Sequence, residues 1–258
     1  MIEVELPAWL APRDQPDLTR VGGNNDGGYV LPRRAIADAD GLIAMGIGSN
    51  WRFEREAHAI NPKLQIHAYD HTVSERLFRR QALAHLATWL LRRGTFAHAW
   101  RQVRRWWDFR SFFGGSATHY QQRIASSLVS TVFERVSGPL LVKIDIEGTE
   151  YEILEHVVDH ADRILGLVIE WHEIRGHQQE FDRLMQRVCE RFTIVHIHGN
   201  NFGLADRTGA DALEVSLMRR DVIPPNAPHV SRLPRPDLDQ PNDPSRPDYQ
   251  LTFASRSS

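Results

Sequence analysis

Two acidic side chains follow a largely apolar stretch in the middle of the chain. Leu140–Ile144 leads into Asp145 and Glu147, and Gly148 then interrupts the pattern before an acidic, amphipathic helix pattern begins. A strand that is buried on both faces has such a near-continuous apolar sequence. Open α/β sheets bind their ligands beyond the carboxyl ends of the strands, so both carboxylates are expected where chemistry takes place.

Carboxylate and imidazole groups also follow two later apolar stretches. Glu170 and His172 lie two residues apart in Ile-Glu-Trp-His, and His196 and His198 are spaced in the same way. On a continuing strand, residues two apart share a face. His198 precedes Gly-Asn-Asn and is the better site candidate, whereas His196 is expected to be a core histidine.

These groups suit the removal of a proton from a hydroxyl group. A hydroxyl is a poor nucleophile at neutral pH and needs a general base or a metal ion. The predicted catalytic residues are Asp145, Glu147, His172 and His198. Asp145, Glu170 and His172 are also a candidate set for Mg²⁺ or Mn²⁺, in which the two carboxylates are the better ligands because imidazole prefers softer metals. A histidine base without metal is the alternative.

A glycine turn lies upstream of these groups. The apolar segment 41–45 opens into Gly46-Ile-Gly48-Ser49-Asn50, and the strand pattern 64–69 then ends on Asp70. Glycines let the backbone approach a ligand, and an acid about 20 residues on can bind ribose hydroxyls. The third glycine of the dinucleotide fingerprint is missing. The turn therefore favours a nucleoside cofactor without a pyrophosphate, such as S-adenosylmethionine, over an ordinary strand–turn–helix.

Three segments resemble FkbM-type S-adenosylmethionine-dependent methyltransferases, in the order of that family. Residues 143–150, Lys-Ile-Asp-Ile-Glu-Gly-Thr-Glu, look like the family signature, and residues 46–54 with 68–70 resemble its first two cofactor motifs. Residues 20–30 are similar to an N-terminal element of one branch, which carries Asp-Gly-Gly-Tyr. The resemblance extends from about residue 20 to residue 218, but residues 73–116 depart from it.

The resemblance implies a class I methyltransferase fold, Rossmann-like, and a methyltransferase activity with S-adenosylmethionine as cofactor. The cofactor-binding residues are then expected to be Asp26, Gly46, Gly48, Ser49, Asn50, Asp70 and Asp145. We expect O-methylation of a carbohydrate or glycoconjugate hydroxyl. The alternative is a binding or membrane-docking module that has kept the fold without turnover. Sugar O-methyltransferases with acids at the corresponding strand ends use a divalent ion, so a bound metal ion is one of the alternatives here.

Alternating patterns predict a mostly parallel α/β sheet with helices on both faces. Strands are expected at 41–46, 64–69, 140–145, 164–170, 193–198 and 213–219, with 118–124 as a further candidate. Helices are expected at 53–60, 127–136, 149–159 and 177–191. No helix pattern separates the last two strands, which indicates an antiparallel pair at one edge. We expect a lead-in at 1–40, a methyltransferase domain at 41–220 and a Pro-rich tail at 221–258 that packs on the domain.

The insert 73–116 is rich in arginine and tryptophan. Nine arginines and four tryptophans lie between residues 74 and 110, against only Glu75 and Asp108 as acids, and the leucine spacing predicts two helices that break near Gly94. Three interpretations remain open: a cap over the active site, an interfacial helix on anionic lipid, or a solvated arginine face with tryptophans in the core.

Composition excludes several classes of protein. A net charge of −2 gives no overall attraction to nucleic acid, and a single cysteine, Cys189, excludes an internal disulfide. The N-terminus lacks the basic and apolar regions of a signal peptide, and no apolar stretch reaches membrane-spanning length. We therefore expect a cytoplasmic protein that acts on a small-molecule or glycan acceptor and is able to work at the inner face of a membrane.

Overall fold

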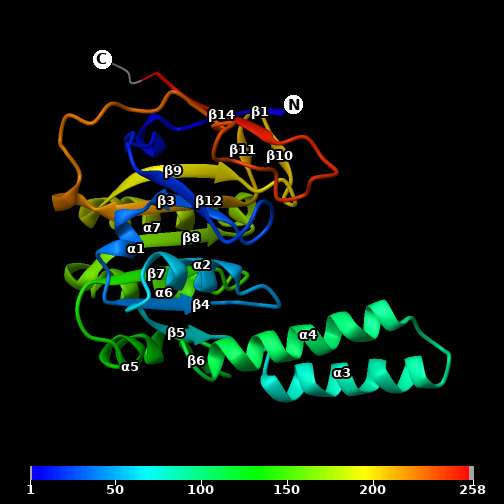
Figure 1. The fold of residues 1–258 in the computed structure, drawn as a ribbon. Helices are drawn as coiled ribbons and strands as arrows, with labels where there is room; N and C mark the ends of the chain where they lie inside the picture. The colour runs from blue at the N-terminus through cyan, green and yellow to red at the C-terminus, as the bar shows by residue number, and fades with distance from the viewer. Residues whose placement is uncertain (1, 256–258) are drawn as a thin grey trace.

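A seven-stranded sheet forms the centre of the computed structural model, which describes residues 2–255 (Figure 1). Its strand order is β6-β5-β4-β7-β8-β12-β9. The strands are β4 (Gly41–Met45), β5 (Gln65–Tyr69), β6 (Ala117–Tyr120), β7 (Leu140–Ile144), β8 (Ile164–Trp171), β9 (Phe192–Gly199) and β12 (Leu213–Arg219). All pairings are parallel except those of β12, which is antiparallel to both β8 and β9.

Helices cover both faces of this sheet and bury it in two apolar clusters. The helices are α1 (Arg34–Ala37), α2 (Arg52–Ile60), α5 (Val129–Glu134), α6 (Glu150–Val158) and α7 (Gln178–Arg191). Ile43 and Met45 of β4 belong to the cluster under α5, α6 and α7, whereas Leu42 and Ala44 belong to the cluster under α1 and α2. Because both faces are buried, the central strands are largely apolar, and the charged residues Lys143 and Glu170 lie near their carboxyl ends.

The predicted fold class, a Rossmann-like mostly parallel sheet with a helical insert, is confirmed. The antiparallel pair at one edge is also present, but β12 lies between β8 and β9, so that β9 is the edge strand. The third parallel strand is β6 at 117–120, shorter than the expected 118–124. Within residues 2–255, short 3₁₀ helices cover Ala8–Leu10, Ser126–Leu128, Ala161–Arg163, Ile174–Gly176 and Arg220–Val222.

Segments from the two ends of the chain lie together beside the β9 edge of the sheet. β1 (Ile2–Leu6) pairs in parallel with β14 (Tyr249–Phe253), which also pairs with β13 (Arg232–Leu233) (Figure 1). β2 (Leu18–Val21) and β3 (Tyr29–Pro32) form a hairpin, and so do β10 (Ala205–Asp206) and β11 (Gly209–Ala210). The N-terminal and C-terminal segments can therefore supply side chains to the same part of the sheet.

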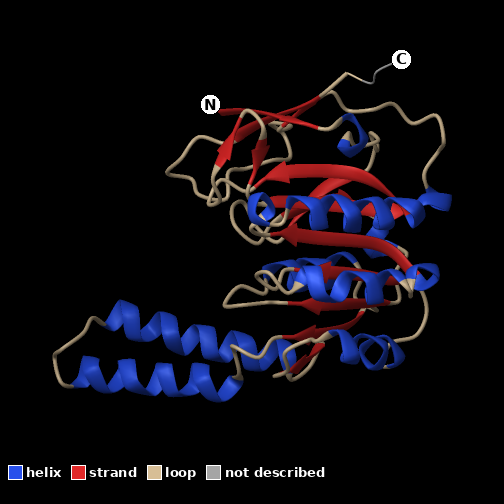
Figure 2. Ribbon diagram, turned by 180° about the vertical axis from the view of Figure 1, so that it is seen from behind, coloured by secondary structure: helices blue, strands red, loops and turns tan. Residues whose placement is uncertain are grey.

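The insert forms a helical hairpin that projects from the domain (Figures 1 and 2). α3 (Glu75–Leu90) and α4 (Phe96–Phe113) are antiparallel neighbours, as the predicted break near Gly94 requires. At its base, Phe78 and Phe109 pack against Trp51, with ring centroids 5.6 and 5.3 Å away. This aromatic contact fixes the hairpin to the segment that follows the glycine turn.

Candidate functional site

A cleft of about 960 Å³ opens at the carboxyl ends of β4, β5, β7 and β8. The predicted residues that line it are Asp26, Gly46, Gly48, Ser49, Asn50, Asp70, Asp145, Glu147, Glu170 and His172. Parallel strands bring their carboxyl ends to one edge of a sheet, which is why residues so far apart in the chain meet here. A cleft of this volume can hold a ligand as large as a nucleotide.

The glycine turn that begins this cleft depends on two left-handed backbone positions. Gly46 has φ 80° and Gly48 has φ 50°, a region that residues with a Cβ rarely adopt. A Cβ at Gly46 would lie 1.6 Å from the carbonyl oxygen of Asp145. The close approach of the turn to the end of β7 therefore requires glycine at position 46.

Asp70 holds this turn in place. One of its oxygens accepts hydrogen bonds from the backbone N–H groups of Ile47 (3.1 Å) and Gly48 (2.7 Å). The other accepts from the backbone N–H (2.7 Å) and hydroxyl (2.6 Å) of Thr72. Burial alone would raise the pKa of Asp70, but these hydrogen bonds from Thr72, Gly48 and Ile47 lower it below its usual value. The four acceptor positions of the carboxylate are filled, so ribose hydroxyls would have to replace the rotatable Thr72 hydroxyl.

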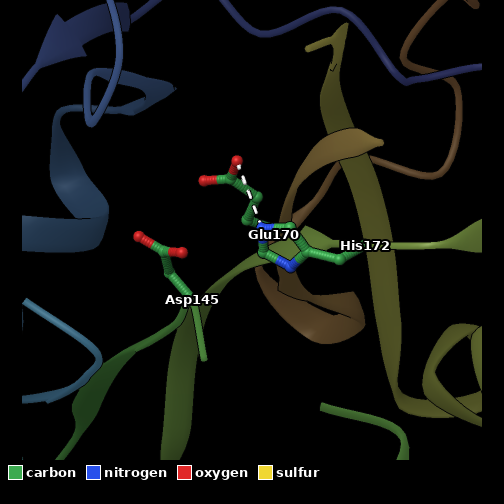
Figure 3. Close-up of side chains that lie close together, drawn as sticks. All are labelled: Asp145, Glu170 and His172. Carbon is green, nitrogen blue, oxygen red and sulfur yellow. Dashed lines mark ion pairs between the residues drawn. The ribbon is translucent and has the colours of Figure 1, made fainter. Parts of the chain in front are cut away.

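Asp145, Glu170 and His172 converge in the cleft from the ends of β7 and β8 (Figure 3). One potential ligand atom from each lies within 4.8 Å of the others. The strand register explains the proximity: Ile144 pairs with Ile169, so the next residues of the two strands, Asp145 and Glu170, are neighbours. The Nε2 atom of His172 lies 3.7 Å from Oε1 of Glu170.

Tyr29 bridges the two carboxylates from the N-terminal hairpin. Its hydroxyl lies 2.9 Å from Oδ2 of Asp145 and 2.7 Å from Oε2 of Glu170. Burial, followed by the charges of Asp145 and Glu214, raises the pKa of Glu170 to about 8. A tyrosine hydroxyl has a single proton. The hydroxyl of Tyr29 can therefore donate to only one of the two carboxylates at a time.

Glu150 orients His172. Its Oε1 lies 3.1 Å from Nδ1 of His172 and accepts from the backbone N–H of the same residue at 2.8 Å. Burial alone would lower the pKa of His172, but its hydrogen bond to Glu150 and the charges of Glu170 and Glu150 raise it to about 9. The protonated ring can donate from Nδ1 to Glu150 and from Nε2 toward the cleft.

Lys143 connects the cluster to the glycine turn. Its buried ammonium group donates to the carbonyl of Gly46 at 2.7 Å and to Oδ2 of Asp145 at 3.1 Å. Burial would lower the pKa of Lys143, but the carboxylates of Asp145 and Glu54 raise it. Asp145 is thus held by Lys143 and Tyr29 through one oxygen, and its side chain remains 27% exposed toward the cleft.

The residues of the cluster fit a divalent cation. Ligand distances near 2.1 Å require ligand atoms no more than about 4.2 Å apart, so small side-chain movements would bring the three atoms within reach of one ion. Negative charge also gathers here: burial and the nearby carboxylates of Asp145 and Glu214 raise the pKa of Asp26 above its usual value. The buried ammonium group of Lys143 partly offsets this negative charge. The glycine turn and the cleft volume likewise fit a nucleoside.

His198 does not lie in this cleft, although we expected it there. Its Nδ1 is 3.2 Å from Glu214 and its Nε2 is 3.1 Å from Asp248, and the side chain is buried. Glu214 of β12 stands between His198 of β9 and Glu170 of β8 in the register of the sheet. The inserted strand β12 therefore separates His198 from the acceptor side, and its position supports a structural role.

The structure also places the other residues singled out in the sequence: His196, Glu147, and Asn50 with Asp26. His196 is a buried histidine, as expected, but its Nε2 pairs with Asp239 at 3.2 Å rather than with backbone. Glu147 lines the cleft with φ 46°, in the left-handed region. Asn50 and Asp26 touch through a 3.1 Å hydrogen bond from the amide of Asn50 to the carbonyl of Asp26.

The interpretation of the insert as a cap over this cleft is wrong. No described residue of α3 or α4 lines it, because the hairpin projects away from the sheet (Figure 1). The hairpin instead borders a separate cleft of about 990 Å³ beside α2, lined by Trp100, Trp107 and several arginines. Ser49 and Asn50 of the glycine turn line both clefts.

Sequence reasoning missed the residues that support the cluster: Tyr29, Lys143, Glu150, Asn200 and Glu214. Lys143 was recognisable, since it is a charged residue in a buried strand two positions before Asp145 and must share its face. Asn200, whose amide donates to Glu170 at 2.7 Å, and Glu214 come from parts of the chain that only the tertiary fold brings close.

Comparison with known proteins finds similarity to solved structures alone. No protein-family model and no curated protein matches the chain. A fibrillarin/Nop5p complex chain is 14% identical with a TM-score of 0.41, covering 83% of this chain and 99% of that one. The O-methyltransferase from Bacillus cereus in complex with SAH is 9% identical with a TM-score of 0.42, covering 72% and 77%.

The O-methyltransferase TomG from Streptomyces achromogenes, in complex with SAM, is 13% identical with a TM-score of 0.41, and the coverage is 72% of this chain and 76% of that one. Similarity at this level carries no argument about substrate or chemistry. Among residues 2–255, no helix has the length and apolar character needed to cross a bilayer.

Proposed function

We propose that this protein is an S-adenosylmethionine-dependent O-methyltransferase that acts on a hydroxyl of a carbohydrate or glycoconjugate. One observation carries the proposal: a single cleft joins the glycine turn and Asp70 to the cluster of Asp145, Glu170 and His172. A nucleoside on the turn would place its reactive end toward the carboxyl ends of β7 and β8. The sequence resemblance to FkbM-type methyltransferases supports the same cofactor.

The cluster suits an acceptor hydroxyl. The acceptor oxygen attacks the methyl carbon as the carbon–sulfur bond breaks toward sulfur, and the acceptor proton passes to the exposed oxygen of Asp145. His172 carries a proton at neutral pH because its pKa is raised to about 9, so it can hold the acceptor oxygen by donating from Nε2. Lys143 and Tyr29 keep Asp145 in place.

We also propose that Asp145, Glu170 and His172 would hold a Mg²⁺ or Mn²⁺ ion, with the two carboxylates as the stronger ligands. In that state the Nε2 atom of His172 would be deprotonated and would face the ion instead of donating to the acceptor oxygen. A divalent ion bound there would lower the pKa of the acceptor hydroxyl. The carbohydrate acceptor is suggested by the polar lining of the cleft, which includes Gln122, Asn200 and Asp211.

Transfer of a labelled methyl group from S-adenosylmethionine to a panel of glycans and glycolipids tests the proposal. We expect Asp145→Asn and His172→Ala to lower kcat by about 10²-fold or more, the usual contribution of a positioned acid–base group. Asp221→Asn, which removes an exposed surface carboxylate, is the matched control and should leave kcat unchanged. Chelator should abolish activity, and Mg²⁺ or Mn²⁺ should restore it.

Turnover near the wild-type rate in both cluster variants would show that the carboxylates are structural. Activity that survives chelator would remove the metal from the proposal and leave Asp145 as the base.

A further inference from the structure

The tip of the α3–α4 hairpin exposes apolar side chains that the fold does not use. Ten large apolar side chains are exposed in the part of the chain that the structure describes. Seven of them belong to the hairpin: Leu83, Trp89, Leu90, Leu91, Phe96, Trp100 and Trp107. Leu90 and Leu91, at the turn, are 70% and 65% exposed. Such a concentration of exposed apolar surface marks an interaction site.

The base of the hairpin is packed, and the tip is not. Phe78, Phe109 and Phe112 are buried at the base, and Ala82 and Ala99 are buried where the helices approach each other. Beyond these positions, the ring of Phe96 lies against those of Trp89 and Trp100, with centroids 5.2 and 6.2 Å apart. The hairpin is thus a firmly based projection with a free end.

The charge of the tip is positive throughout. Arg92 and Arg93 lie in the turn, and no acidic residue occurs between residues 83 and 104. The two acids of the hairpin are both near its base and are both paired: Asp108 with Arg55 at 2.6 Å and Glu75 with Arg110 at 3.6 Å. Leucine and aromatic side chains flanked by arginines match the interface of an anionic bilayer, where apolar groups enter the acyl region and arginines meet the head groups.

We propose that the tip, residues 86–100, docks the protein on an anionic lipid bilayer. A second copy of the chain fits less well, since two such tips would bring like charges together. Single-stranded nucleic acid would use the arginines and aromatic rings, but it gives no reason for exposed Leu90 and Leu91.

Orientation links this surface to the cleft. The hairpin extends to the same side as the carboxyl ends of the parallel strands, which point right in Figure 1 and left in Figure 2. A bilayer in contact with the tip therefore lies on the side toward which the cleft opens. This arrangement, which rests on the proposed function, favours an acceptor hydroxyl in a lipid-linked head group.

Co-sedimentation of the full chain with vesicles tests docking without cofactor or acceptor, so its outcome is independent of the methyltransferase proposal. We expect binding to phosphatidylcholine vesicles that contain about one third phosphatidylglycerol, and weaker binding as salt rises from about 0.05 to about 0.5 M. The combined change Leu90→Ser, Leu91→Ser and Phe96→Ser should weaken binding by about 100-fold or more. Arg92→Gln with Arg93→Gln should weaken it roughly 30-fold.

Leu204→Ser is the matched control, because Leu204 is 71% exposed but lies outside the hairpin. It should bind vesicles as the wild type does. Circular dichroism should show that all variants are folded, since the altered side chains are exposed. Absence of binding to anionic vesicles, or equal weakening by Leu204→Ser, would overturn the proposal. So would self-association of the wild type that the triple variant abolishes, or a tip-dependent shift of single-stranded RNA without vesicle binding.

Discussion

At the scale of single residues, the candidate site depends on groups that hold one another in place through hydrogen bonds and opposite charges. Lys143 and Tyr29 converge on one oxygen of Asp145, and Glu150 fixes His172 through both its ring and its backbone. Buried carboxylates are costly unless they are paired. The arrangement therefore leaves one oxygen of Asp145 and Nε2 of His172 as the groups able to act on a ligand.

The buried, doubly paired His198 predicts how the free energy of unfolding depends on pH. Burial alone would lower the pKa of His198, but its hydrogen bonds to Asp248 and Glu214 and the charges of these carboxylates raise it to about 10. The bound proton stabilises the fold fully below the unfolded-state pKa near 6.5, and this contribution is lost as pH rises toward about 10. We expect the free energy of unfolding to fall over this window.

Urea denaturation of the wild type and of His198→Gln checks this. At pH near 6.5 the substitution should cost about 3–5 kcal/mol, because it leaves Glu214 and Asp248 buried without their cation. The difference between the two proteins should shrink toward pH 9.5 or above, as the wild-type imidazole loses its proton. A difference that stays constant with pH would show that His198 is neutral in the fold.

At the scale of elements, the sequence predicted the strands and helices whose positions follow from the spacing of apolar residues. The apolar strands β4, β7 and β8 and the helices between them were recognisable because burial on both faces dictates their composition. The two helices of the insert followed from the leucine spacing and Gly94. Periodicity could not show where the hairpin would point, because that direction depends on the contact of Phe78 and Phe109 with Trp51.

This contact predicts unequal effects of two tryptophan substitutions. Trp51 is buried, its ring packs on the base of the hairpin, and its Nε1 donates to Asp108 at 3.1 Å. Trp51→Ala should therefore lower the free energy of unfolding by about 3–5 kcal/mol. Trp107→Ala, which removes a ring that is 57% exposed, should change it by less than about 0.5 kcal/mol. Equal costs in urea denaturation would mean that the hairpin is not held at Trp51.

At the scale of the whole molecule, both ends of the chain supply partners to buried polar side chains of the sheet. Asp26 and Tyr29 come from the N-terminal segment, and Asp239, Asn242 and Asp248 come from the C-terminal segment. Asn242 donates to Glu214 at 2.6 Å, and Asp239 pairs with His196. The sequence predicted a Pro-rich tail that packs on the domain. It could not reveal these pairings, since no periodicity relates a Pro-rich segment to β9 and β12.

Removal of the tail should consequently destabilise the entire fold. Truncation after Leu238 deletes β14, the carboxylates that pair with His196 and His198, and the amide that binds Glu214. Each buried partner left unpaired costs about 3–5 kcal/mol, and a whole domain has only about 5–15 kcal/mol of stability. We expect the truncated chain to be unfolded by circular dichroism, whereas truncation after Ala254 should remain folded. If the chain truncated after Leu238 is folded and unfolds cooperatively, the tail is not needed for the fold.

The central claim is that the glycine turn and Asp70 bind S-adenosylmethionine, and isothermal titration tests it most directly. The wild type should bind S-adenosylmethionine in a one-to-one complex and should not bind NAD tightly, because the turn lacks the third glycine of the dinucleotide fingerprint. Asp70→Ala should weaken binding by about 1–3 kcal/mol, or roughly 5- to 150-fold, with Asp221→Asn as the control. Thr72→Val should not weaken it, because it frees an acceptor position on Asp70. Unchanged affinity in Asp70→Ala, absence of binding by the wild type, or tight binding of NAD would contradict the account.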